Sequence, residues 1–169
     1  NSGLDETQIE KAEKDWRLLD AKRITRPDSF RFVVESVGQY DEIYIVKKAI
    51  EVMINKIQKL ADDINSNKDN ILKKSLCTIE NSYDIKLIGE DYTLGKVIEF
   101  ILYQNYFEKT LSYCGFRKPH PHIDESIIRI AFIEKSDESN VVDLIIDACK
   151  TAEQVYKKID VGVSNFNSE

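Results

Sequence analysis

Two long amphipathic segments constrain this fold more than any other feature of the sequence. Between residues 41 and 64, and again between 141 and 159, apolar side chains recur with a period near 3.5, and charged side chains occupy the opposite face. A single helix cannot bury such a stripe on itself, so each segment needs a partner. Packing the two helices antiparallel across a sheet satisfies both stripes at once.

Shorter apolar patterns predict strands around these helices. Side chains alternate with a period of two over residues 30–35, 83–87 and 127–132, and residues 111–116 indicate another short strand. The expected order is strand and long helix, then a linker, then strand, helix, two strands and a second long helix. We therefore predict an α+β dimerisation module with a mixed or antiparallel sheet and long packed helices.

The sequence also indicates how the chain is divided. A charged stretch with a short helix near residues 5–20 precedes the first strand, and a polar, turn-rich stretch separates the two halves. The predicted segments are an N-terminal extension (1–27), a first half with one strand and one long helix (28–64), a linker (65–81), a second half (82–160) and a polar tail (161–169).

Charge and composition exclude some classes of function. The chain of 169 residues has 24 Lys and Arg against 30 Asp and Glu, a net charge of −6, whereas a protein that grips nucleic acid phosphates needs a basic face. No apolar run approaches the roughly 20 residues of a membrane span. Three widely spaced cysteines, an odd number, favour a reducing compartment over a disulfide framework. We expect neither direct nucleic acid binding nor membrane insertion.

A search for catalytic motifs finds no phosphate-binding glycine loop, no nucleophile elbow and no Cys-x-x-Cys pair. The segment His120-Pro121-His122, with Cys114 upstream and Asp124 downstream, is the one place to consider a metal. Closed zinc sites have paired ligand spacings that are absent here. A turn stiffened by its prolines is the favoured interpretation, and we expect no cofactor or metal.

One glycine, near the start of a predicted helix, is unfavourable for helix formation, and its presence there calls for an explanation. Gly95 follows Asp91 and Thr93, either of which can cap the helix, and a helical glycine costs on the order of 1 kcal/mol relative to alanine. The glycine is either incidental or marks a point where a partner approaches the backbone closely.

Two motifs in this order resemble a known family. Residues 90–96 (Glu-Asp-Tyr-Thr-Leu-Gly-Lys) and 113–121 (Tyr-Cys-Gly-Phe-Arg-Lys-Pro-His-Pro) are similar to the small alpha-like subunits of cellular RNA polymerases, namely the eleventh subunit of RNA polymerase II and the archaeal L polypeptide. The similarity covers about half the chain. Lys96, Tyr92 and Phe116 stand where that family usually has Asn, His and Tyr.

The first half resembles the partner of that small alpha-like protein. Residues 28–38 (Asp-Ser-Phe-Arg-Phe-Val-Val-Glu-Ser-Val-Gly), followed by a long helix, are similar to the end of the larger alpha-like protein, which is the third subunit of RNA polymerase II or the archaeal D polypeptide. A D-like end joined to an L-like domain resembles a fusion typical of large cytoplasmic DNA viruses of eukaryotes. The beginning of a D-like polypeptide is missing, so we expect residues 1–169 to be the C-terminal part of a longer polypeptide.

The resemblance implies a non-catalytic assembly subunit of a multisubunit DNA-dependent RNA polymerase. Its expected partners are the two largest subunits, which carry the active-site metal, other small polymerase subunits and the missing N-terminal D-like part. An intracellular location follows, in the host cytoplasm or the virion if the protein is viral.

The resemblance and the helical stripes together predict which residues lie at interfaces. Those expected to dock or pack at the motifs are Thr93, Leu94, Gly95, Lys96, Gly115, Phe116, Pro119, His120 and Pro121. Those expected in the seam between the long helices are Ile50, Met53, Ile57, Val141, Ile145 and Ala148.

Two other functions compete with the polymerase interpretation. A stand-alone adaptor would form a homodimer through its long helices and recruit no large subunits. A small metal- or histidine-dependent enzyme would be centred on Cys114, His120 and His122.

Overall fold

The computed structural model describes residues 5–165, and its contacts fall into two units, Asn1–Glu35 and Ser36–Glu169. The first unit contains helix α1 (Glu6–Leu18) and a single 3-10 turn (Ala21–Arg23). A capping box starts α1: the Asp5 carboxylate accepts the Glu6 N–H, and Gln8 accepts the Asp5 N–H. This confirms the short helix predicted near residues 5–20.

The strand predicted over residues 30–35 does not form. Among the described residues no strand pairs with this segment, and Phe30 and Phe32 are 75% and 86% exposed. A strand requires a neighbour that satisfies its N–H and C=O groups. An alternating pattern therefore does not make a strand by itself, because the segment must also pair with a neighbour.

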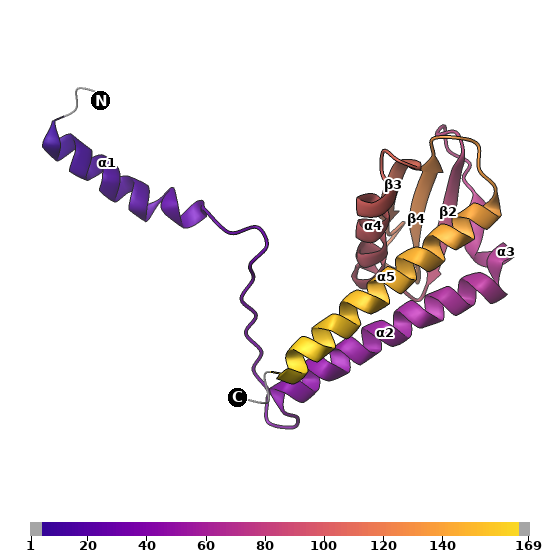
Figure 1. Ribbon diagram of the computed structural model, residues 1–169, viewed down its shortest axis with the longest axis horizontal. Coiled ribbons are helices and arrows are strands. Elements are labelled where there is room, and N and C mark those ends of the chain that lie inside the picture. Colours follow the sequence, from indigo (N-terminus) through magenta and orange to yellow (C-terminus); the bar gives the residue numbers. More distant parts are fainter. Residues whose placement is uncertain (1–4, 166–169) are drawn as a thin grey trace. The chain divides into compact units, whose positions relative to one another are not determined.

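The second unit is a sheet with helices on one face (Figure 1). Its strands follow the order β1-β2-β4-β3, and every pairing is antiparallel, which confirms the α+β prediction. The elements are α2 (Glu42–Ser66), α3 (Lys68–Ile71), β1 (Leu72–Lys74), β2 (Ser82–Ile88), α4 (Tyr92–Tyr106), β3 (Leu111–Arg117), β4 (Glu125–Phe132) and α5 (Glu138–Asn165).

Two stretches differ from the predicted organisation. The interval 65–81, predicted to be a linker, holds α3 and the edge strand β1, because Ile71 and Leu72 are buried against the core. The polar tail predicted from residue 161 is helical as far as Asn165. A single glycine, Gly162, weakens a helix by only about 1 kcal/mol and does not end it. Residues 166–169 lie outside the described part.

The helices α2 and α5 run side by side in opposite directions (Figure 1). Gln58 donates to Glu153 over 2.8 Å, and Lys68, just after the end of α2, pairs with Glu138 at the start of α5 over 3.4 Å. The antiparallel packing predicted from the two stripes is therefore present.

The core lies where this helix pair meets the sheet. The seam places Ile57 and Ile64 of α2 beside Ile145 and Ala148 of α5, and α4 contributes a third apolar face. From the sheet, the fully buried side chains of this core include Ile85, Leu87, Leu111, Ile128 and Ile130. Because all three helices cover the same face, the other face of the sheet carries no helix of the second unit.

Among residues 5–165, no helix combines the length and the apolarity needed to cross a membrane.

We predict that truncation of the seam destabilises the second unit. Ile57 is 1% exposed, so Ile57→Ala should lower the free energy of unfolding by about 2–5 kcal/mol through lost burial and a cavity. Val52 lies on the same helix and is 43% exposed, so Val52→Ala should change it by no more than about 0.5 kcal/mol. Urea unfolding measures both. Equal losses of free energy of unfolding in the two variants would contradict the burial of Ile57 in the seam.

Candidate functional site

The two sequence motifs meet at the start of α4. Asp91 caps the helix by accepting the Thr93 N–H over 3.0 Å, so of the two possible caps the structure uses Asp91. The same backbone hydrogen bond is the main cause that lowers the pKa of Asp91. The cap fixes where α4 begins and so which of its residues face β3.

Gly95 is the contact point between the motifs. A Cβ placed on Gly95 would overlap the aromatic ring of Phe116 on β3. Tyr92 packs on the same ring edge-on, with 5.2 Å between ring centroids. The group that approaches the Gly95 backbone closely is therefore Phe116 of this chain, whereas approach by a partner stays a prediction.

Glu99 ties the same two elements together by polar contacts. Its side chain accepts the Phe116 N–H over 3.0 Å and forms an ion pair with Lys96, which stands where the family usually has Asn. The Cys114 thiol donates to the Glu99 carbonyl over 3.7 Å, and burial raises the pKa of Cys114 to about 12. Helix α4 and strand β3 are thus joined both by apolar packing and by hydrogen bonds.

The turn after β3 projects from this junction. Pro119, His120 and Pro121 are exposed. His120 Nδ1 accepts the His122 N–H over 3.2 Å, and the centroids of the two imidazole rings lie 5.2 Å apart. These contacts hold the turn in one shape and leave its outer surface open.

The possible ligands of a metal are separated. Cys114 is directed to α4, whereas the two histidines lie in the exposed turn. Within residues 5–165, no three His, Cys, Asp or Glu side chains gather into a metal-binding group. This arrangement gives the enzyme alternative no support.

Sequence reasoning missed the link between the motifs and α2. Lys56 of α2 pairs with Glu90 over 2.7 Å, and the Ser126 hydroxyl donates to the Glu90 carbonyl. Nothing in the local sequence marks this pair, because its members belong to different predicted halves. It connects the long helix of the first half directly to the motif of the second.

The predicted seam residues lie apart from the motifs, between α2 and α5. Met53 is partly buried there. The others are buried: Ile50, Ile57, Val141, Ile145 and Ala148. Of the remaining motif residues, Leu94 is buried in the core, Thr93 is exposed and Gly115 is half-buried.

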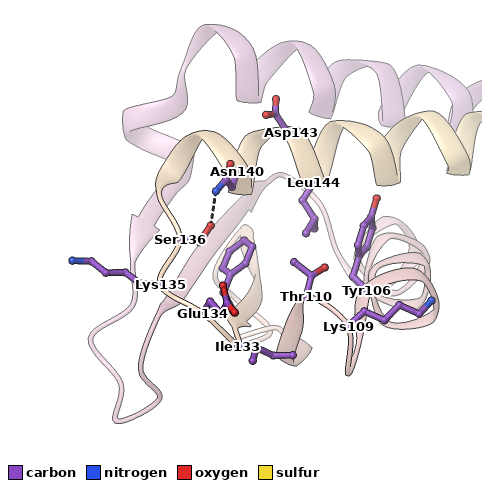
Figure 2. Close-up of a pocket in the computed structure, with 11 residues that line it drawn as sticks. Tyr106, Lys109, Thr110, Ile133, Glu134, Lys135, Ser136, Asn140, Asp143 and Leu144 are labelled. Atoms are coloured by element: carbon purple, nitrogen blue, oxygen red, sulfur yellow. Dashed lines mark hydrogen bonds between the residues drawn. The ribbon is translucent and has the colours of Figure 1, made fainter.

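A pocket of about 630 Å³ opens beside the C-terminal end of α4, and no predicted site residue lines it (Figure 2). Phe132 and Leu144 form its apolar floor. Its rim carries both positive side chains (Lys109 and Lys135) and negative ones (Glu134 and Asp143). The mixture of charges selects no ligand class.

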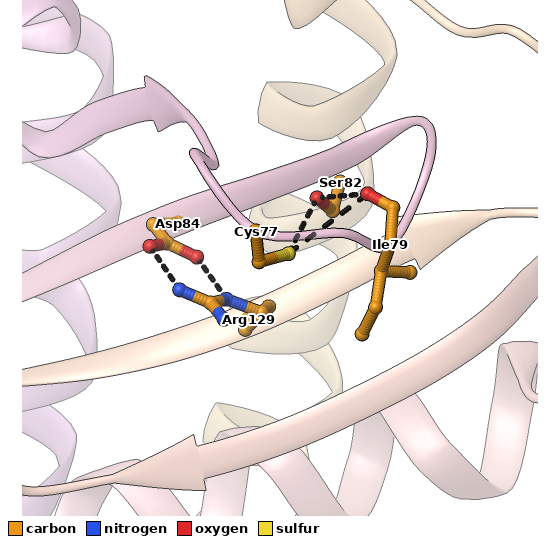
Figure 3. A network of polar contacts seen from close by, with 5 residues as sticks. All are labelled: Cys77, Ile79, Ser82, Asp84 and Arg129. Carbon is orange, nitrogen blue, oxygen red and sulfur yellow. Dashed lines mark hydrogen bonds and ion pairs between the residues drawn. The ribbon is translucent and has the colours of Figure 1, made fainter.

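Cys77 lies in the loop before β2, close to the Asp84–Arg129 ion pair (Figure 3). Its sulfur is 3.3 Å from the Ser82 hydroxyl. The hydroxyls of Ser75 and Ser82 and then the backbone of Ile79 lower the pKa of Cys77 to about 7. Cys77 therefore differs sharply from the buried Cys149, whose pKa burial raises to about 12.

Residues 82–161 match the family of the RNA polymerase Rpb3/Rpb11 dimerisation domain. The matched range begins at β2 and includes both motifs and most of α5. It coincides closely with the second half predicted from the sequence.

Two relatives extend this finding. A protein of Acanthamoeba polyphaga mimivirus named as DNA-directed RNA polymerase subunit R470 is 24% identical over 135 residues, which is 79% of this chain and 35% of the relative. A protein of Caenorhabditis briggsae named as subunit RPAC2 of RNA polymerases I and III is 30% identical over 73 residues, which is 43% of this chain and 46% of the relative. The chain thus spans about a third and just under half of these relatives.

We predict that the backbone at Gly95 tolerates no side chain while Phe116 is present. Gly95→Ala should destabilise the protein by about 1–3 kcal/mol through overpacking. In a Phe116→Ala background the same change should be neutral or stabilising by up to about 1 kcal/mol, because alanine favours the helix. Urea unfolding of the four proteins measures this double-mutant cycle.

Gly115 provides the matched control for this cycle. A Cβ on Gly115 would lie 2.5 Å from the Tyr113 hydroxyl, the far end of a flexible side chain. Gly115→Ala should therefore cost less than about 1 kcal/mol. If the effects of Gly95→Ala and Phe116→Ala on the free energy of unfolding are additive, the Phe116 ring is not the reason why position 95 requires glycine.

We predict that Cys77 is the fastest-reacting cysteine in the folded protein. Since the thiolate is the nucleophile, its alkylation by iodoacetamide should reach half its maximal rate near pH 7, whereas Cys114 and Cys149, with pKa values of about 12, should stay slow up to about pH 9. Mass spectrometry of the labelled peptides measures the rates. In Cys77→Ser only the slow reactions should remain, and a fast Cys114 would refute the assignment.

Proposed function

We propose that this chain is a non-catalytic assembly subunit of a multisubunit DNA-dependent RNA polymerase, because residues 82–161 match the family of the RNA polymerase Rpb3/Rpb11 dimerisation domain. In this role it supplies the alpha-like dimerisation platform on which the two largest subunits dock. Both relatives are named as RNA polymerase subunits, and the mimivirus relative supports a viral setting, in the host cytoplasm or the virion.

One observation supports the docking role: the two motifs meet at the Phe116 ring, and the turn that follows it is exposed. Phe116 is held by Gly95, Tyr92 and Glu99, so the turn that follows leaves β3 in a fixed direction. Rigid surfaces bind with a smaller loss of conformational entropy than mobile ones do. The motif surface consists of Thr93, Lys96, Phe116, Pro119, His120 and Pro121.

The far half of the helix pair supports a D-like partner. Within the second unit, α2 buries nothing before Ile50, and α5 buries nothing after Ala152. Several apolar side chains are nevertheless exposed there, among charged ones: Tyr44, Ile45, Val155, Ile159 and Val161. Contiguous apolar surface on a helix pair marks an interaction site.

An approximate two-fold relation identifies what would cover that surface. Strand β4 precedes α5, and the strand-patterned residues 30–35 precede α2 in the same way. The two helices are antiparallel, and a sheet packs on only one end of the pair. A second sheet, contributed by a D-like partner, would pack on the other end and cover the apolar side chains.

Affinity purification with mass spectrometry tests the proposal. The tagged chain, expressed with its natural partners, should recover very large polymerase subunits. A variant with His120→Ala and Pro121→Ala should recover about tenfold less of them and keep the same urea midpoint, because these side chains are exposed.

The exposed residue Lys150 on α5 gives the control, and Lys150→Ala should leave recovery unchanged. A homodimer without large subunits would favour the adaptor and overturn the proposal. Stoichiometric zinc, lost in the turn variant, would favour the enzyme.

A further inference from the structure

The face of the sheet that carries no helix has a pattern of its own. Asp84 alternates with the core residues Ile85 and Leu87 on β2, so its side chain points away from the helices. Residues paired directly across strands share a face. This open face therefore includes Lys73, Asp84, Lys86, Tyr113, Arg117, Glu125 and Arg129.

The carboxylates on the open face are already neutralised. Arg129 holds Asp84 through two hydrogen bonds of 2.6 and 2.7 Å, and Lys86 binds Glu125 over 3.0 Å; Figure 3 shows the first of these pairs. This pairing raises the pKa of Arg129, chiefly through the hydrogen bond with Asp84. The centre of the open face is thus electrically balanced.

The cations at the two edges of the open face form no ion pairs within the described residues. Lys73 lies on the edge strand β1 and Arg117 on the opposite edge strand β3, and neither forms an ion pair with any residue of the described range. Four cations face two carboxylates, so the open face is positive in a chain of net charge −6. An acidic protein with one cationic face attracts acidic partners there and repels them elsewhere.

Tyr113 gives the same face an apolar contact. Its ring lies along β3 across Gly115, where the absence of a Cβ leaves room for it, and the residue is 41% exposed. The aromatic ring lies beside Arg129, since Gly115 pairs with Arg129 in the sheet. The loop before β2 places Cys77 close to the Asp84–Arg129 pair, and beyond it Lys73, Arg117 and the Tyr113 ring are exposed, an arrangement that suits an extended peptide.

We propose that the open face binds an acidic segment of a partner polypeptide, an inference that rests on the assembly role proposed above. Three inter-strand spacings separate β1 from β3, about 14 Å, which an extended segment covers in about four residues. Two carboxylates at that separation reach Lys73 and Arg117 together. Single-stranded nucleic acid fits less well, because it stacks on several aromatic rings, whereas Tyr113 is the one aromatic residue that the described strands place on this face.

A direct binding measurement tests the inference on the full chain. The probe is a fluorescein-labelled dodecapeptide of alternating glutamate and serine, followed by fluorescence anisotropy at low and moderate salt. Charge reversal by Lys73→Glu with Arg117→Glu should weaken binding about tenfold or more, and Lys73→Gln with Arg117→Gln about threefold. The matched control is Lys59→Glu with Lys150→Glu on exposed helical positions, which should weaken binding less than about twofold.

Three results would overturn the inference. These are no binding of the peptide at millimolar concentration, equal weakening by the control pair, or tighter binding of dodecathymidylate than of the peptide with loss in the same variants. The affinity purification tests the assembly role independently of this inference. If the intact chain recovers none, the assembly role fails, and the peptide result still decides whether the open face binds acidic segments.

Discussion

The antiparallel packing of α2 on α5 is the interaction on which the rest of the structure depends. Each helix has an apolar stripe that water would otherwise contact, and burial of such surface contributes about 25 cal/mol per Å². The seam also supplies the surface against which the sheet and α4 pack, so Ile57 and Ile145 belong to the same core as Ile85 and Ile128. Without the pair, the four-stranded sheet would have one apolar face and too little to cover it.

The elements that the sequence predicts well are those fixed by local chemistry. The two stripes determine α2 and α5, the alternating runs determine β2 and β4, and Asp91 determines the start of α4. The elements that it misplaces depend on distant neighbours. Residues 30–35 have the pattern of a strand but pair with no strand of the described sheet, and β1 forms inside a predicted linker because β2 offers it an edge. Long-range pairs such as Lys56 with Glu90 leave no periodic signal at all.

The candidate site shows the same division. Gly95 can be singled out from sequence because a glycine early in a helix requires a reason, yet the reason, the Phe116 ring, is visible only in three dimensions. Glu99 has no such local signal, although it joins α4 to β3 through the Phe116 N–H. The motif residues thus act mainly by fixing the shape of a surface. A surface of fixed shape is what the proposed assembly role requires.

The presence of α2 and α5 in one polypeptide has a consequence for assembly. When two halves are separate chains, their pairing is bimolecular and depends on concentration. Here α3, β1 and a short loop connect them, so pairing is intramolecular, with an effective concentration that commonly reaches the millimolar range for short connections. The two halves are therefore made in equal amounts and meet at a rate that does not fall when the protein is scarce. The pairing of the two long helices thus becomes part of the folding of a single chain.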